Sequence, residues 1–128
     1  MLDTTTSARA QAVLDALGEA LAAGDIDRAC DLFVTDCYWR DLVSFTWNIR
    51  TMEGRDQVAE MLRAQLGHIQ PTGWLLDPSE VPGEEDGVIT AWFQFETAVG
   101  RGYGLIRLRD GRIWTLLTAL QELKGFEE

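Results

Sequence analysis

The spacing of hydrophobic residues predicts helices in the first half of the chain. Leucine, valine and alanine recur every three or four positions between residues 8 and 21, which is the period of an amphipathic helix. The threonine-rich segment 4–7 can cap its start, and Gly24 can end it in the left-handed conformation. Asp25 can then cap a second, short helix that carries Ile26, Ala29, Cys30 and Phe33.

A third apolar stripe follows a segment with strand character. Cys37, Trp39, Asp41, Val43 and Phe45 alternate with other residues and are expected on one face of a strand. The helical period returns after residue 54 and predicts a third helix from about Arg55 to Leu66, closed by Gly67.

The rest of the chain predicts strands. Thr72–Leu76 is a short candidate, and the proline-rich and acidic stretch 77–87 is expected to be a loop. Val88–Ala98 alternates, with Ile89, Ala91, Phe93 and Phe95 on one face and Trp92 on the other. Tyr103–Arg109 and Arg112–Leu123 are two further strands, joined by a tight turn at Asp110–Gly111.

This order of elements predicts an α+β fold in one domain, residues 1–128. The strands are expected to form a curved antiparallel sheet, and the three helices are expected to cover one of its faces. A length of 128 residues with 46% hydrophobic residues is sufficient for a single core.

Charge and cysteine content argue against several classes of partner, of protein and of metal site. The chain has 11 basic and 21 acidic residues, a net charge of −10, which argues against nucleic acid or an anionic membrane as partner. No apolar run is long enough for a membrane span, and the first residues lack a secretory pattern. The two cysteines fit neither a disulfide scaffold nor a zinc site, and free thiols favour the cytoplasm. The single histidine gives no basis for a metal site, and no cofactor is expected.

The order of elements, with the residues within it, resembles the nuclear transport factor 2-like superfamily, which includes SnoaL-like polyketide cyclases and ketosteroid isomerase. The resemblance implies a cone, in which a strongly bent mixed or antiparallel sheet wraps around three helices and encloses a pocket. Within it, five segments resemble the N-terminal domain of flavin-containing monooxygenase-like proteins: Tyr38–Leu42, Phe45–Thr51, Phe95–Thr97, Gly100–Gly102 and Trp114–Gly125. The chain has no G-x-G-x-x-G motif after a strand, so flavin chemistry is not implied for it.

Asp41 is the strongest catalytic candidate. An apolar cone disfavours the charged carboxylate, which makes Asp41 a candidate general base. By resemblance, Asp36–Asp41 matches the isomerase segment that ends in the base. The isomerase's oxyanion-binding groups have no counterpart, because the first helix lacks tyrosine and Gly104 takes the place of the acid. A structural role for Asp41, as a tether to Arg50 or Arg55, is the alternative.

The aromatic residues suggest a pocket and an interface. The expected pocket lining consists of Trp39, Val43, Phe93, Phe95, Ile106, Leu116 and Thr118, and Tyr38 and Tyr103 are weaker candidate hydroxyl donors. Trp92 points outward and, with Trp114, is expected in a homodimer interface. Arg107 and Arg109 are expected to pair with Glu96 or Glu122.

Three functions follow from these residues. The first is a domain that binds a small apolar molecule. The second is a proton-transfer enzyme of the isomerase, cyclase or dehydratase type with Asp41 as base. The third is a dimerising accessory domain for a flavoprotein partner. The fold alone does not choose among the three, because one scaffold hosts many functions.

Overall fold

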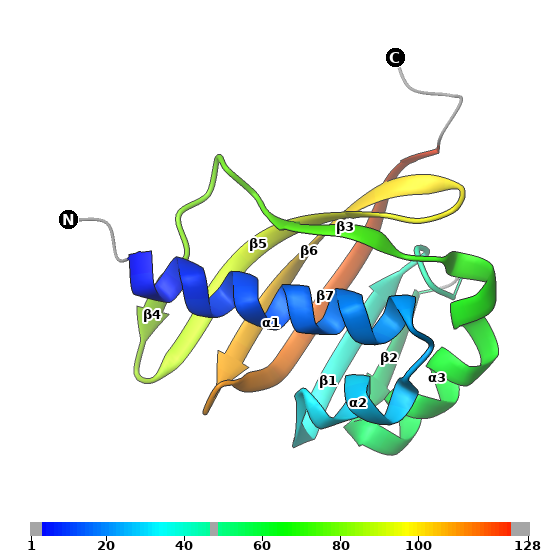
Figure 1. The fold of residues 1–128 in the computed structure, drawn as a ribbon, viewed down its shortest axis with the longest axis horizontal. Helices are drawn as coiled ribbons and strands as arrows, with labels where there is room; N and C mark the ends of the chain where they lie inside the picture. The colour runs from blue at the N-terminus through cyan, green and yellow to red at the C-terminus, as the bar shows by residue number, and fades with distance from the viewer. Residues whose placement is uncertain (1–3, 47–48, 124–128) are drawn as a thin grey trace.

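The computed structural model describes residues 4–46 and 49–123. Its helices are α1 (Thr4–Ala22), α2 (Ile26–Asp31) and α3 (Gly54–Ile69). Its strands are β1 (Phe33–Leu42), β2 (Ile49–Glu53), β3 (Thr72–Leu76), β4 (Gly83–Glu85), β5 (Val88–Glu96), β6 (Gly100–Arg109) and β7 (Arg112–Leu123). Figure 1 shows α1 lying across one face of the sheet, with α2 and α3 gathered beside β1 and β2.

The strands form one mixed sheet. Their order is β2-β1-β7-β6-β5-β3, and β4 pairs with β5 along the edge that β3 also uses. The pair β1–β7 is parallel, whereas the other pairs are antiparallel. The α+β architecture of helices packed on a curved mixed sheet is therefore confirmed.

Most of the predicted elements are present, with three corrections. The strand expected from Cys37 begins at Phe33, which was expected in the second helix, whereas that helix ends at Asp31. The strand stops at Leu42, because Val43 takes a left-handed φ of 72° that breaks the extended chain. The short strands β2 and β4 were not expected. Gly67 does not end α3, since the helix continues to Ile69 and Gln70 supplies the left-handed cap with a φ of 50°.

The tight turn before β7 follows its sequence signal. Asp110 and Gly111 have φ values of 54° and 76°, as a type I′ hairpin requires. Gly24 ends α1 with a φ of 69°, as expected.

The strand β5 separates the two faces of the sheet as its alternation predicts. Ile89, Ala91, Phe93 and Phe95 are each at most 2% exposed, whereas Trp92 is 38% exposed on the opposite face. The buried side chains meet those of α1, α3 and β1 in one core. We call the face that carries Phe93 the inner face and the face that carries Trp92 the outer face.

Candidate functional site

Aromatic rings fill the space on the inner face. Trp39 stacks on Phe33 at 5.9 Å between ring centroids and meets Phe45 edge-on at 5.0 Å. Phe45 continues the contact to Phe95 at 6.1 Å, and Phe95 stacks on Trp74 at 5.1 Å. Aromatic pairs at these separations are attractive beyond the area that they bury. These rings and that of Phe93, which we call the aromatic interior, form one connected cluster.

The residues expected to line a pocket are mostly buried on the inner face of the sheet. Six of them are at most 2% exposed and belong to the inner face: Trp39, Phe93, Phe95, Ile106, Leu116 and Thr118. Val43 is half-buried at the end of β1. Their packing against one another makes this region a core in the described structure, and their role in a pocket stays a prediction.

Glycines on β6 make room for two of these rings. Gly102 lies opposite Phe95 and Gly104 opposite Phe93 in the β5–β6 register. A Cβ atom on Gly102 would lie 2.5 Å from the Phe95 ring, and one on Gly104 would collide with the Phe93 ring and the Leu117 carbonyl. The glycines therefore let phenylalanine rings lie flat against the neighbouring strand, which is a known way to protect strand glycines.

Asp41 is completely buried, and the chain itself supplies its hydrogen-bond donors. Oδ1 accepts from Ser44 Oγ at 2.5 Å and from Thr118 Oγ1 at 2.6 Å. Oδ2 accepts from the backbone N–H groups of Phe45 and Thr46, both at 2.8 Å, and from Thr46 Oγ1 at 3.1 Å. Five donors compensate the desolvation of a buried carboxylate.

These bonds tie together three segments of the molecule. Asp41 lies next to the last residue of β1, Thr118 belongs to β7, and residues 44–46 lie in the loop after β1. Trp39 Nε1 extends the network by donating to Thr118 Oγ1 at 2.8 Å. The tether anticipated for Asp41 is thus present, but hydroxyl and backbone groups make it. Arg50 is exposed, and Arg55 donates instead to the carbonyl of Phe33.

The loop after Asp41 is strained. Val43 is β-branched, and a φ of 72° is a rare conformation for such a side chain. The turn directs the N–H groups of Phe45 and Thr46 back to the carboxylate. The five hydrogen bonds of Asp41 therefore hold a backbone conformation that would otherwise be unfavourable.

The two tyrosines lie away from this network. Tyr38 is 44% exposed and Tyr103 is 38% exposed. Tyr103 pairs with Gln94 on β5, which belongs to the outer face with Trp92. The structure therefore does not bring either hydroxyl to Asp41.

Trp74 has a buried polar atom that sequence reasoning missed. The side chain is 7% exposed, and its indole Nε1 has no hydrogen-bond partner among the described residues. The backbone around it is satisfied, because Gln11 on α1 donates to the Trp74 carbonyl at 3.1 Å and accepts from Leu76 N at 2.9 Å. The sequence carried no signal for this N–H beyond the presence of a tryptophan on a strand.

Two hollows adjoin the helices. One, of about 370 Å³, lies between α1 and β3 and is bordered by Leu14, Gly18, Ala22, Pro71 and Trp74. The other, of about 570 Å³, lies between the ends of α1 and α3 and the start of β3. Ala22, Pro71 and Thr72 border both. We call them the Trp74 hollow and the helix-end hollow.

The outer face carries its own aromatic residues. Trp92 and Tyr103 contact each other with ring centroids 6.3 Å apart. Trp114 is half-buried, and the Arg109 guanidinium lies 5.1 Å from its ring centroid, a cation–π distance. Both tryptophans predicted at an interface therefore lie on or beside this face.

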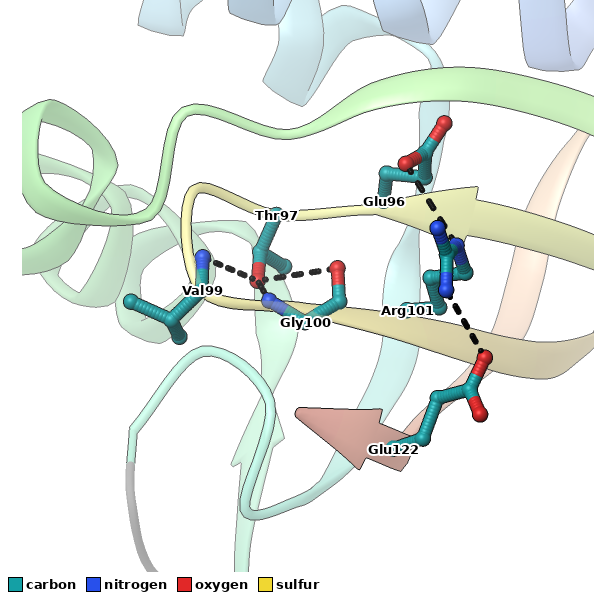
Figure 2. Close-up of polar contacts among 6 residues, drawn as sticks. All are labelled: Glu96, Thr97, Val99, Gly100, Arg101 and Glu122. Atoms are coloured by element: carbon teal, nitrogen blue, oxygen red, sulfur yellow. Dashed lines mark hydrogen bonds and ion pairs between the residues drawn. The ribbon is translucent and has the colours of Figure 1, made fainter. Parts of the chain in front are cut away.

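Charged residues form ion pairs at one end of the outer face. Arg101 lies 3.8 Å from a carboxylate oxygen of Glu96 and 3.0 Å from one of Glu122, which joins β5, β6 and β7, as Figure 2 shows. In the adjoining hairpin turn, Thr97 Oγ1 accepts from Gly100 N at 3.1 Å. The expected partners were wrong for Arg109, which pairs with Asp36. Arg101, not Arg107 or Arg109, holds the two glutamates.

Both cysteines are free and buried. Burial raises the pKa of the Cys30 thiol, with a further increase from Asp27 and a smaller opposing effect of Arg63. Burial also raises the pKa of Cys37. Residues 4–46 and 49–123 contain no cluster of histidine, cysteine and acidic side chains that could hold a metal ion. No helix in these ranges is long and apolar enough to cross a membrane.

Most of the chain matches the model of a known family. The model of the SnoaL-like domain matches residues 14–116, which include α2, α3 and most of the sheet. The chain belongs to the SnoaL-like domain family. A comparison with curated proteins finds no match.

Solved structures share the fold of this SnoaL-like domain. A ketosteroid isomerase-like protein from Erwinia carotovora atroseptica is 12% identical, with a TM-score of 0.70 over 88% of this chain and 93% of the other. An NTF2-like protein with a cystatin-like fold from Novosphingobium aromaticivorans is 16% identical, with a TM-score of 0.65 over 93% and 84%.

A third relative is larger. The orange carotenoid protein of Anabaena (Nostoc) sp. PCC 7120, in a structure described as binding canthaxanthin, is 18% identical with a TM-score of 0.65. The match covers 84% of the SnoaL-like domain and 35% of that protein. At these identities the likeness concerns the fold alone.

Proposed function

We propose that this SnoaL-like domain binds a small, flat, apolar molecule that carries a hydrogen-bond acceptor, and that the molecule contacts Trp74 at the edge of the aromatic interior. The observation that carries the proposal is the buried indole N–H, which has no acceptor among the described residues. A buried donor left unpaired costs about 1–3 kcal/mol, and a ligand oxygen at Nε1 would remove that cost.

The surroundings of Trp74 suit such a ligand. The indole already stacks on Phe95 with 12° between the ring planes and lies 5.6 Å from Phe93 between centroids. Flat apolar molecules bind well against such rings, and the single donor would set their orientation. The Trp74 hollow offers about 370 Å³ beside the same side chain.

Gly18 lets the Trp74 indole pack directly against α1. A Cβ atom at this position would lie 2.7 Å from Trp74 Cδ1. The indole therefore fills the space that a side chain on α1 would take, and a ligand would reach Nε1 only when the indole shifts toward the Trp74 hollow. The relative described as binding canthaxanthin supports the proposal at the level of the fold.

The test compares a matched pair of probes, 2-acetylnaphthalene and 2-ethylnaphthalene, which differ in the carbonyl oxygen. We expect the ketone to bind about tenfold more tightly in calorimetry, as one recovered hydrogen bond implies. The indole N–H signal of Trp74, assigned by its loss in Trp74→Phe, should shift with the ketone only. Equal affinities, or an unchanged indole signal, would contradict the proposal, and Trp92→Phe on the outer face is the control.

Homodimer formation through the outer face is a second candidate function. The partly exposed Trp92 and Tyr103 favour it, because exposed neighbouring aromatics are typical of interface cores. We expect a dimer in sedimentation experiments that Trp92→Arg converts to a monomer. Leu75→Arg is the control, since Leu75 is 55% exposed on β3, at the edge of the sheet. A monomer at all concentrations would exclude this candidate.

Proton transfer and a flavoprotein partner have less support than ligand binding. The five donors that already occupy the carboxylate of Asp41 favour a structural role for it over that of a base. The flavoprotein partner rests on sequence resemblance alone. The buried free thiols are compatible with a cytoplasmic location.

A further inference from the structure

The helix-end hollow is separate from the aromatic interior and combines an apolar wall with a cationic side chain. Leu21 and Leu62 are buried in the wall at 3% and 0% exposure, and Ile26 and Leu66 are half-buried there. Its volume of about 570 Å³ lies within the range of small-molecule sites in proteins. Arg63, which is exposed on α3, borders the same space.

Arg63 lacks the acidic partner that several other arginines of this chain have. It forms no hydrogen bond or ion pair within residues 4–46 and 49–123, whereas Arg9, Arg28, Arg101 and Arg109 each pair with a carboxylate. A guanidinium that no carboxylate of the described residues occupies, beside apolar side chains, is a good site for an external carboxylate.

Opposing charges near the hollow are compensated only in part. The carbonyl ends of α1 and α3 would repel an anion. Backbone N–H groups already occupy three of these carbonyls, since Asp25 N donates to Ala20, Gly24 N to Leu21 and Gln70 N to Leu66. Asp27 on α2 is exposed and makes no ion pair with Arg63 among the described residues.

We propose that the helix-end hollow binds a small amphipathic carboxylate, with its apolar part against Leu21, Leu62 and Leu66 and its carboxylate on Arg63. This site does not depend on the proposed site at Trp74. The two differ in their ligands, because one requires a neutral acceptor and the other a negative charge.

The experiment uses octanoate and 1-octanol as matched probes for the whole chain. We expect calorimetry to show octanoate binding about tenfold more tightly than 1-octanol, because one charge-assisted hydrogen bond separates them. Arg63→Gln should abolish this preference, and Arg63→Lys should retain part of it. Arg112→Gln changes an exposed arginine at the first position of β7 and should leave the preference unchanged.

Nuclear magnetic resonance places the probe. Methyl signals of Leu62 and Leu66 should shift on addition of octanoate, and the indole signal of Trp74 should not. Equal affinity for acid and alcohol, no binding of octanoate, or unchanged binding in Arg63→Gln would overturn the proposal. Shifts confined to the aromatic interior would also overturn it. The Trp74→Phe variant should bind octanoate normally, so the two proposals fail independently.

Discussion

Asp41 and Trp74 both carry buried polar atoms beside the aromatic interior, and the chain treats these atoms in opposite ways. The carboxylate of Asp41 accepts five hydrogen bonds from residues 44–46 and Thr118. The indole N–H of Trp74 has no partner among the described residues. The first region therefore helps to hold the fold together, and the second is the place where we propose that another molecule binds.

The free-energy cost of burial explains why it is the carboxylate of Asp41, and not the indole N–H of Trp74, that is fully hydrogen-bonded. An ionised carboxylate without donors costs far more to bury than a neutral N–H group. The fold must therefore satisfy Asp41 completely, even with a left-handed φ at Val43. An unpaired indole N–H is tolerable at about 1–3 kcal/mol, which a stable domain can sustain.

The largest expected effect comes from removing the carboxylate. We expect Asp41→Ala to lower the free energy of unfolding by about 3–5 kcal/mol, because buried donors in the 44–46 loop and on β7 lose their acceptor. Urea denaturation followed by circular dichroism measures this loss. Asp41→Asn keeps the shape and should fall between the two proteins. A change below about 1 kcal/mol in Asp41→Ala would show that the network contributes little.

Replacing Trp39 and Trp74 by phenylalanine should give the next largest contrast in stability. Trp39→Phe removes the donor to Thr118 and leaves a gap, so we expect a loss of about 2–3 kcal/mol. Trp74→Phe leaves a similar gap but removes a donor that has no partner among the described residues, so its effect should stay within about 1 kcal/mol of zero. Thermal and urea unfolding of both variants test the comparison. Equal losses would mean that the N–H of Trp74 is not costly.

The smallest contrast concerns two helical glycines. Gly67 has open space around its Cβ position, and Gly67→Ala should stabilise the protein by about 1 kcal/mol through helix propensity. Gly18→Ala gains the same propensity but presses on Trp74, so we expect a net loss of about 1 kcal/mol. If both variants are stabilised, the Trp74 side chain moves more freely than its packing indicates.

The sequence was sufficient for the layers of the fold because hydrophobic period depends on burial. The alternation along β5 placed Phe93 inside and Trp92 outside, and the Asp110–Gly111 pair located a hairpin. The sequence was not sufficient to locate the end of a helix where more than one residue can take the left-handed capping position. Gly67 remained helical while Gln70 took the left-handed position, because a helix tolerates glycine when its next turn is still packed.

The polar details of the site depend on three-dimensional contacts that the pattern does not contain. A carboxylate followed by Ser44 and Thr46 three and five residues later is a recognisable turn signal, and it indicates the local donors of Asp41. Thr118 lies 77 residues away and could not be inferred as a donor. The sequence also could not predict that the Trp74 N–H lacks a partner among the described residues, because this depends on which acceptors the fold brings within hydrogen-bond distance.

The parallel pair of β1 and β7 has a consequence for synthesis of the protein. Leu42 pairs with Ala119, so strand β1 has no partner on that side until β7 has also left the ribosome. Trp39 and Phe45 would be exposed on the nascent chain until then. A ribosome-bound fragment ending before β7 should bind general chaperones, whereas a longer fragment from which β7 has emerged should fold.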